Sequence, residues 1–204
     1  IIDELRESGV AVIGDVVDVA ESRQVAHLAD RAFAEFGGVH LLMNNAGVGI
    51  GGAIAEAETK KLDMQIDVNL RAVYLVTRES IPMLKAAGAD VGSLLVNTAS
   101  IAGKRPQGWL AAYSATKAAV ISLTQNLARE WGPKNIRVNA LSPGFFPAEQ
   151  NRKVLTPDRV QNIMAHTPVG RFGEPRELAA AILLMASNAA GSFLTGANIV
   201  VDGG

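Results

Sequence analysis

The sequence predicts an α/β fold: one domain built on a parallel β-sheet that is covered by helices on both faces. Two observations carry this prediction. Short β-branched runs alternate with longer helical stretches, and the strand-like runs are apolar, as expected of strands buried on both faces. The 204 residues, 49% hydrophobic and 19% charged, suffice for one domain with a substantial core and argue against disorder.

The first half of the chain supplies two predicted strands and two predicted helices. VAVIGDVVDV, residues 10–19, is rich in β-branched residues and predicts a strand. Residues 22–37 predict a helix, because apolar side chains share one helical face and a glycine follows. VHLLMNNAG, residues 39–47, predicts a strand that runs into polar residues, and a helix follows over about residues 68–87.

The second half repeats the pattern. GSLLVNTAS, residues 92–100, and IRVNALSPG, residues 136–144, predict strands on either side of a helix over residues 111–131. Residues 145–173 are less regular. A helix is predicted over residues 175–187, beginning with a proline in its first turn, and ANIVVDGG is the last strand.

Composition excludes several classes of protein. The net charge is -1 and no basic tract occurs, so nucleic acid is a poor candidate partner. No cysteine is present and the three histidines are scattered, so neither a disulfide framework nor a metal site is supported. No apolar run approaches the roughly 20 residues that cross a bilayer, and a soluble cytoplasmic protein is expected.

Polar and small residues gather where three predicted strands end. These ends are residues 44–47, 97–100 and 142–144, and Asp18 lies near a fourth. In an open parallel sheet, ligands bind beyond the carboxyl ends of the strands, so these ends predict a binding site. The glycine-rich GVGIGG, residues 47–52, is interpreted as a flexible loop, because seven residues separate it from the next helix and a phosphate loop opens its helix directly.

Tyr113 and Lys117 stand four residues apart in the predicted helix over residues 111–131, so they share one helical face. An ammonium beside a phenol favours the phenolate, and a proton-transfer group works best when it titrates near ambient pH. The pair could therefore be a proton-transfer unit. The same spacing is also common on solvated helices, and the pair alone does not decide between these interpretations.

Taken together, the motifs resemble the short-chain dehydrogenase/reductase family over the whole chain. The matching residues, in order, are NNAG at 44–47, Asn69, Ser100, the YSATK segment at 113–117, RVNALSPG at 137–144 and the terminal VDGG. Ser100 precedes Tyr113 by twelve intervening residues, as the family pattern requires. The resemblance implies a Rossmann-like, doubly wound parallel sheet in a single domain over residues 1–204.

The resemblance implies hydride transfer between a nicotinamide cofactor, NAD or NADP, and an alcohol or carbonyl. Tyr113 would donate or accept the hydroxyl proton. Lys117 would favour the phenolate and hydrogen-bond the nicotinamide ribose. Ser100 would orient and polarise the substrate oxygen, and Asn69 would hold a water that links Lys117 to solvent. The cofactor carries the hydride step, so no metal ion is required.

The resemblance also assigns further contacts to the cofactor. Asp18 and Val19 would lie near the adenine. Asn45, Ala46 and Gly47 would lie against the adenosine ribose, and Pro143 and Gly144 would lie by the nicotinamide. Tyr113 and Lys117 would contact the cofactor as well. The alternative for residues 45–47 and for residues 143–144 is that they form ordinary turns after their strands.

The start of the chain departs from the family. Members begin with a strand, a glycine-rich turn, a helix and a second strand, and none of these is found here. In the family strand order, 3-2-1-4-5-6-7, residues 10–19 and 39–47 would be strands 3 and 4, and the latter would expose an unpaired edge. We expect that the sequence omits an N-terminal portion. The position that selects NAD or NADP would lie there, so the choice is open.

Residues 145–173 are expected to form a lid over the substrate. Residues 143–155 and 165–175 resemble the mannonate/fructuronate oxidoreductase branch of the family, so a polyol or sugar acid is expected. Arg152 could clamp a carboxylate and Gln150 could bind a hydroxyl, although Arg152 could also be solvated. Gln107 is a weaker candidate, together with Arg105 and Trp109.

Two alternatives to this function stay open. One is a 3-oxoacyl thioester reductase that uses the same four residues, and the other is a non-catalytic dinucleotide-binding scaffold. Family members form homotetramers or homodimers, and interfaces would involve residues 68–87, residues 111–131 and the C-terminal helix and strand.

Overall fold

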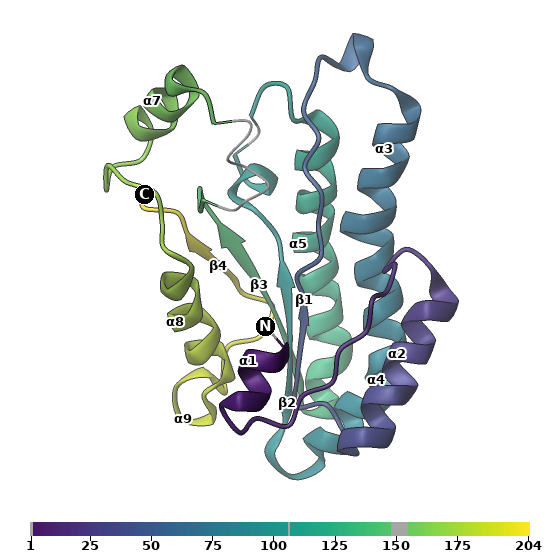
Figure 1. The fold of residues 1–204 in the computed structure, drawn as a ribbon. Coiled ribbons are helices and arrows are strands. Elements are labelled where there is room, and N and C mark those ends of the chain that lie inside the picture. The colour runs from purple at the N-terminus through teal and green to yellow at the C-terminus, as the bar shows by residue number, and fades with distance from the viewer. Residues whose placement is uncertain (1, 106, 148–154) are drawn as a thin grey trace.

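The computed structural model describes residues 2–105, 107–147 and 155–204, and it places one sheet between two groups of helices (Figure 1). Four parallel strands lie in the order of the chain: β1 (Leu41–Asn44), β2 (Ser93–Thr98), β3 (Ile136–Pro143) and β4 (Asn198–Val201). The predicted α/β fold with a parallel sheet is confirmed.

Helices cover both faces of this sheet. On one face α4 (Ala72–Val91) and α5 (Ala111–Trp131) pack on the strands, and α2 (Ser22–Phe36) packs on α4. On the other face α8 (Pro175–Ala186) packs on β2, β3 and β4. The remaining helices and helical turns are α1 (Ile2–Glu7), η1 (Ile54–Glu56), α3 (Thr59–Ile66), η2 (Asp67–Arg71), η3 (Ile101–Gly103), η4 (Gly132–Lys134), α7 (Pro157–Ala165) and α9 (Asn188–Gly191).

The central strands explain why the strand-like runs are apolar throughout. Side chains alternate between the two faces of a strand. In β2, Leu95 packs with the core beneath α4 and α5, whereas Leu94 and Val96 pack with Met185 of α8. All three β2 side chains are essentially inaccessible to solvent. Burial on both sides is the property that favours apolar residues at every position.

A buried chain of polar side chains crosses the sheet just below its carboxyl edge. The Asn44 amide donates to the Thr77 hydroxyl of α4 at 3.1 Å and to the Asn97 amide oxygen at 2.9 Å. Asn97 donates in turn to the Thr124 hydroxyl of α5 at 2.9 Å, and Thr124 donates to the Val120 carbonyl at 2.8 Å. Buried amides are tolerated here because each finds partners.

The strand predicted over residues 10–19 is wrong. No residue in this stretch belongs to a strand, and Val16 is fully exposed. A β-branched run becomes a strand only when a neighbouring strand supplies hydrogen-bond partners, and among the described residues β1 pairs only with β2. Of the strand predicted over residues 39–47, only Leu41–Asn44 form a strand, β1, and its other edge is unpaired among the described residues, as expected.

The helix predicted over about residues 68–87 is longer and contains an irregularity. Helical residues run without a break from Thr59 through α3, η2 and α4 to Val91. The central segment, η2, is a π-helical turn, and the Ala72 amide donates to the Asp67 carbonyl five residues earlier. Such turns are rare and often occur at functional sites. Asn69 lies at the middle of this one.

The less regular segment over residues 145–173 contains helix α7, which the sequence analysis did not predict. Its start carries ordinary helix signals: the Thr156 side chain accepts a hydrogen bond from the Arg159 amide, Pro157 occupies the first turn, and Asp158 follows. In the three described ranges no helix is long and apolar enough to cross a bilayer.

Candidate active site

The carboxyl ends of the four parallel strands lie at one edge of the sheet, which is where ligands bind in open parallel sheets. β1 ends at Asn44, β2 at Thr98 and β3 at Pro143, and the α5 helix begins beside this edge. The loops that leave these ends carry most of the residues that the sequence assigned to a site.

Lys117 is held inside the protein. Only 4% of the residue is exposed, and its ammonium donates to the Thr98 carbonyl at the end of β2 at 2.8 Å. The ammonium lies 5.9 Å from the centre of the Tyr113 ring. Burial lowers the pKa of Lys117 to about 8. The interpretation of the pair as residues on a solvated helix surface is therefore wrong for the lysine.

Asn69 fixes the loop that follows β1. Its amide oxygen accepts from the Val48 amide at 2.8 Å, and its amide nitrogen donates to the Val48 carbonyl at 2.8 Å and to the Thr116 hydroxyl at 3.1 Å. Thr116 in turn donates to the Tyr113 carbonyl at 2.8 Å. Both amide hydrogens of Asn69 are thus used by the protein. The π-helical turn, the β1 loop and the first turn of α5 are joined at this one side chain.

The loop that Asn69 fixes passes close to both Lys117 and Tyr113, and its glycine at position 47 leaves space beside the lysine. A Cβ on Gly47 would lie 3.3 Å from both the Lys117 ammonium and the Asn69 amide oxygen. A Cβ on Gly49 would lie 3.6 Å from the Tyr113 ring. A side chain at Gly47 would therefore crowd the ammonium. The residues present fit a group that approaches Lys117 from this loop, as a nicotinamide ribose would.

Ser100 lies at the start of η3, directly after β2. It is 9% exposed, and its hydroxyl oxygen accepts from the Ala102 amide at 3.1 Å. Within residues 2–105, 107–147 and 155–204 its O–H has no acceptor, and no direct hydrogen bond joins it to Tyr113. The hydroxyl is thus oriented by the backbone while its proton is available to a bound oxygen atom.

The other cofactor residues predicted after β1 and β3 lie at the same edge of the sheet, some exposed to solvent and one required by packing. Asn45, Ala46 and Gly47 are exposed just beyond β1, and the Asn45 amide oxygen accepts from the Thr98 hydroxyl at 3.2 Å. Pro143 ends β3. Gly144 is required by packing, because a Cβ there would lie 2.6 Å from the Asp202 Cα.

Asp18 and Val19 precede α2. The Asp18 carboxylate accepts from the Ala20 amide at 2.9 Å, and the Asp18 amide donates to the Gln24 side chain at 2.9 Å. Asp18 is exposed and Val19 is partly exposed. The turn is joined to the π-helical segment, because Arg71 donates to the Ala20 carbonyl at 2.7 Å.

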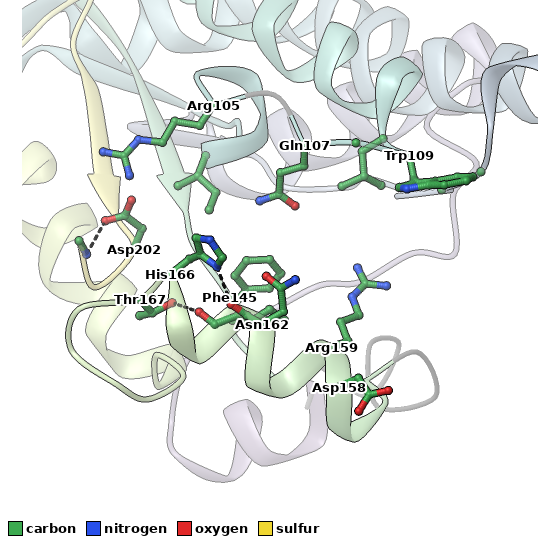
Figure 2. A pocket seen from close by; sticks show the side chains of 17 residues that line it. Arg105, Gln107, Trp109, Phe145, Asp158, Arg159, Asn162, His166, Thr167 and Asp202 are labelled. Carbon is green, nitrogen blue, oxygen red and sulfur yellow. Dashed lines mark hydrogen bonds between the residues drawn. The ribbon is translucent and has the colours of Figure 1, made fainter.

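A cavity of about 1040 Å³ adjoins this edge (Figure 2). Gln107, Arg105 and Trp109 line it, as the sequence analysis anticipated for a substrate site. Gln150 and Arg152 lie outside the described residues. Ser100 and Tyr113 are not part of the lining, but Ile101 and Leu110, which do line the cavity, are close to them in the chain.

Helix α7 contributes a wall that the sequence analysis missed. Arg159, Asn162 and His166 face the cavity from this helix, at the three- and four-residue spacing of one helical face. The His166 Nδ1 lies 2.8 Å from the Asn162 carbonyl, which can only accept, so Nδ1 carries the proton. The helix signals at Thr156–Pro157 followed by this spacing were sufficient to find the wall.

The cavity carries both signs of charge. Arg105 and Arg159 form no ion pair with any residue that the structure describes, and Asp158 and Asp202 also line the cavity. Figure 2 shows Arg105 extending toward the end that holds Asp202, whereas Arg159 reaches from α7 toward the wall that carries Trp109. No group of three or more side chains suited to a metal ion occurs in the described part of the chain.

A parallel sheet whose carboxyl edge brings together a buried lysine, a tyrosine and a serine oriented by a backbone amide, near a substrate-sized cavity, defines a dinucleotide-dependent alcohol or carbonyl oxidoreductase. Comparison with known proteins identifies the family. The model of the family described as enoyl-(acyl carrier protein) reductase matches residues 2–204. The chain belongs to the short-chain dehydrogenase/reductase family, and it is an NAD- or NADP-dependent oxidoreductase that transfers hydride between a nicotinamide and an alcohol or ketone.

Two relatives illustrate the range of the family. A 3-oxoacyl-(acyl-carrier-protein) reductase of Thermotoga maritima is 33% identical over 190 residues, 93% of this chain and 75% of the relative. A cis-4-hydroxycyclohexanecarboxylate dehydrogenase of Sinomonas cyclohexanicum is 37% identical over 206 residues, 98% of this chain and 79% of the relative.

Solved structures agree with this assignment. A gluconate 5-dehydrogenase from Burkholderia cenocepacia, in complex with NADP and tartrate, has a TM-score of 0.92 and is 31% identical, covering 100% of this chain and 78% of that chain. A 3-ketoacyl-(acyl-carrier-protein) reductase from Brucella melitensis, complexed with NADH, has a TM-score of 0.88 and is 34% identical. The non-catalytic scaffold is thus not supported.

Proposed function

We propose that Tyr113, Lys117, Ser100 and Asn69 form the catalytic centre of a hydroxy-acid oxidoreductase. The main support for this proposal is that the Lys117 ammonium is buried beside the Tyr113 ring. A bound nicotinamide supplies the hydride chemistry. Tyr113 exchanges the hydroxyl proton, and Ser100 donates its free O–H to the substrate oxygen. Asn69 fixes the loop that leaves Lys117 open to the cofactor ribose, and the water predicted near Asn69 stays part of the proposal.

The remaining cofactor contacts belong to the same proposal. Gly47, after β1, lies beside the Lys117 ammonium, Pro143 ends β3 at the carboxyl edge of the sheet, and Arg71 joins the Asp18 turn to the π-helical segment that holds Asn69. These positions support the predicted contacts with NAD or NADP. The substrate lid predicted over residues 145–173 stays part of the proposal, and its support is that α7, which lies within this range, forms one wall of the cavity. The cytoplasmic location predicted from the sequence stays a prediction.

The two arginines that line the cavity support an acidic substrate, in line with the predicted polyol or sugar acid, and Asp158 and Asp202 on the same lining can accept hydrogen bonds from its hydroxyl groups. Two arginines without ion-pair partners among the described residues face the cavity, and Gln107 and Asn162 offer amides for hydroxyl groups. A guanidinium pairs with a carboxylate through two parallel hydrogen bonds. Similar proteins act on or hold acids: one is named for a cyclohexanecarboxylate, and another was solved with tartrate.

Replacing Arg159 with glutamine is expected to lower kcat/KM for hydroxy acids about tenfold, because a hydrogen-bonded charge pair is lost. The ratio for matched neutral alcohols should stay unchanged. The measurement is nicotinamide reduction with both substrate sets, repeated for Arg105→Gln. Arg129→Gln, in the last turn of α5 and outside the cavity, is the control. Equal losses on acids and neutral alcohols would refute an anion-binding role for either arginine.

A 3-oxoacyl thioester reductase is the second candidate. Its support is the matched family model and the reductase relatives at 31% to 34% identity. A 3-oxoacyl thioester and the hydroxy-acid panel, assayed with the same enzyme, separate the two candidates. Preference for the thioester would displace the hydroxy-acid proposal.

We further propose that the chain self-associates as a homotetramer or homodimer. Four large apolar residues of the C-terminal part of the chain are exposed, which supports an interface there: Leu183 and Leu184 on α8, Phe193 after α9 and Val200 on β4. Leu183→Glu is expected to lower the assembly size measured by light scattering after gel filtration. Val169→Glu, also an exposed apolar position but outside α8 and β4, is the control. An unchanged size would place the interface elsewhere.

A further inference from the structure

The backbone of Trp109 is in an unusual conformation. Its φ is 68°, in the left-handed region, and among the described residues the only other non-glycine residue with positive φ is Asn135. Asparagine tolerates this region, whereas a bulky aromatic residue there is a real outlier. Such outliers persist only where the surrounding structure enforces them, and they concentrate at functional sites.

The loop after β1 enforces this conformation. The Gly52 amide donates to the Trp109 carbonyl at 2.8 Å. A Cβ on Gly51 would lie 3.2 Å from the same carbonyl and 3.3 Å from the Leu110 side chain. The loop backbone thus approaches Trp109 closely at Gly51, and the Gly52 amide holds the Trp109 carbonyl just before α5, although a Cβ on Gly52 itself would meet nothing within 4 Å.

The Trp109 indole is mostly exposed, so its burial contributes little stability. Trp109 is 71% exposed, so the unfavourable backbone is not offset by packing in the core. The exposed indole lines the cavity, on the wall opposite α7, and Arg159 reaches toward that wall (Figure 2). An exposed indole and a guanidinium that has no ion-pair partner among the described residues thus line the same cavity.

We propose that Trp109 is a specificity-determining residue, whose indole contacts the carbon skeleton of substrates that combine a ring with a carboxylate. The inference rests on the proposed hydroxy-acid function and narrows it. A flat indole offers its largest contact to another flat or ring-shaped apolar surface. Arg159 would bind the acid group while the ring lies against the indole. Open-chain hydroxy acids use the guanidinium but gain little from the indole.

The experiment uses four substrates: a hydroxycyclohexane carboxylate, an open-chain hydroxyalkanoate of equal carbon number, and the two corresponding neutral alcohols. Trp109→Ala is expected to lower kcat/KM for the ring carboxylate about tenfold more than for the open-chain acid. Trp109→Phe keeps an aromatic face and should retain most of the ring preference. Binding is also followed without turnover, by the fluorescence of Trp109 in a Trp131→Phe background when the ring carboxylate is added.

A stability measurement separates the indole from the backbone conformation. Trp109→Gly removes the Cβ, so its Tm should rise by about 3 °C over that of Trp109→Ala, which keeps the Cβ and the unfavourable φ. Both variants should lose the same ring preference. Equal Tm values would refute the enforced conformation.

The outcomes keep the two proposals apart. Equal losses for ring and open-chain acids in Trp109→Ala, or no fluorescence change on adding the ring carboxylate, would overturn the role of Trp109. A wild-type enzyme that prefers the neutral alcohols would overturn the hydroxy-acid proposal, and the comparison of ring with chain would still test Trp109.

Discussion

Replacing Tyr113 with phenylalanine is expected to lower kcat about 1,000-fold, within the range that general acid–base catalysis contributes. The substitution removes one oxygen atom and keeps the ring beside Gly49, so the loop and α5 should keep their positions. KM should change little, because the proton is transferred in the transition state rather than on binding.

The sequence offers a matched control for this substitution. Tyr74 is the only other tyrosine, and it is 55% exposed on α4 and does not line the cavity. Tyr74→Phe should leave kcat within twofold of wild type, whereas Tyr113→Phe should be nearly inactive with the same thermal stability. The assay is steady-state nicotinamide reduction with the best acid substrate. A kcat for Tyr113→Phe close to that of Tyr74→Phe would contradict the proton-transfer role.

Replacing Lys117 with methionine is expected to lower kcat about 100-fold, because the charge that favours the phenolate is lost while the aliphatic volume is kept. The same variant also tests how the buried ammonium affects stability. Folding lowers the pKa of Lys117 from 10.5 to about 8, so between these values the unfolded chain binds more protons than the folded chain. The free energy of unfolding of the wild type should therefore rise with pH across this window.

The size of this rise is about 3 kcal/mol, since each pKa unit corresponds to about 1.4 kcal/mol. Lys117→Met has no ammonium to bury, so its free energy of unfolding should not rise in this pH window. The free energy of unfolding of the wild type should therefore increase relative to that of the variant as the pH increases. Urea unfolding at several pH values between about 8 and 10.5 measures it. Lys85→Met, at an exposed position of α4, should follow the wild type. Parallel curves for all three proteins would show that the ammonium is not buried.

Local patterns in the sequence predicted the features that depend on neighbours along the chain or on general rules of parallel sheets. The alternation of apolar runs and helical stretches predicted the covered sheet, and the strand-end rule predicted which loops meet at one edge. The spacing of Tyr113 and Lys117 predicted a shared helical face. Burial of the lysine did not follow from that spacing, because it depends on Thr98 and on the glycine at position 47.

Features that depend on distant partners were missed. Residues 10–19 have strand composition, but no strand among the described residues pairs with them. The π-helical turn at Asn69 could not be predicted from local propensity. Its Asn69 amide bonds Val48, which lies in the loop after β1 and is distant in the sequence. The α7 wall was missed for another reason: its start signals are local and were overlooked in a segment rich in turn residues.

The amide pair of Asn44 and Asn97 has a consequence for how the strands align. The two residues are register partners, and their side chains turn toward the hydroxyls of α4 and α5. Sliding either strand by a single position would turn its asparagine toward the opposite face, where the leucines and methionine beneath α8 offer no hydrogen bonds. The amides thus favour one alignment of the strands, since a sheet slipped by one position would contain a desolvated, unsatisfied amide.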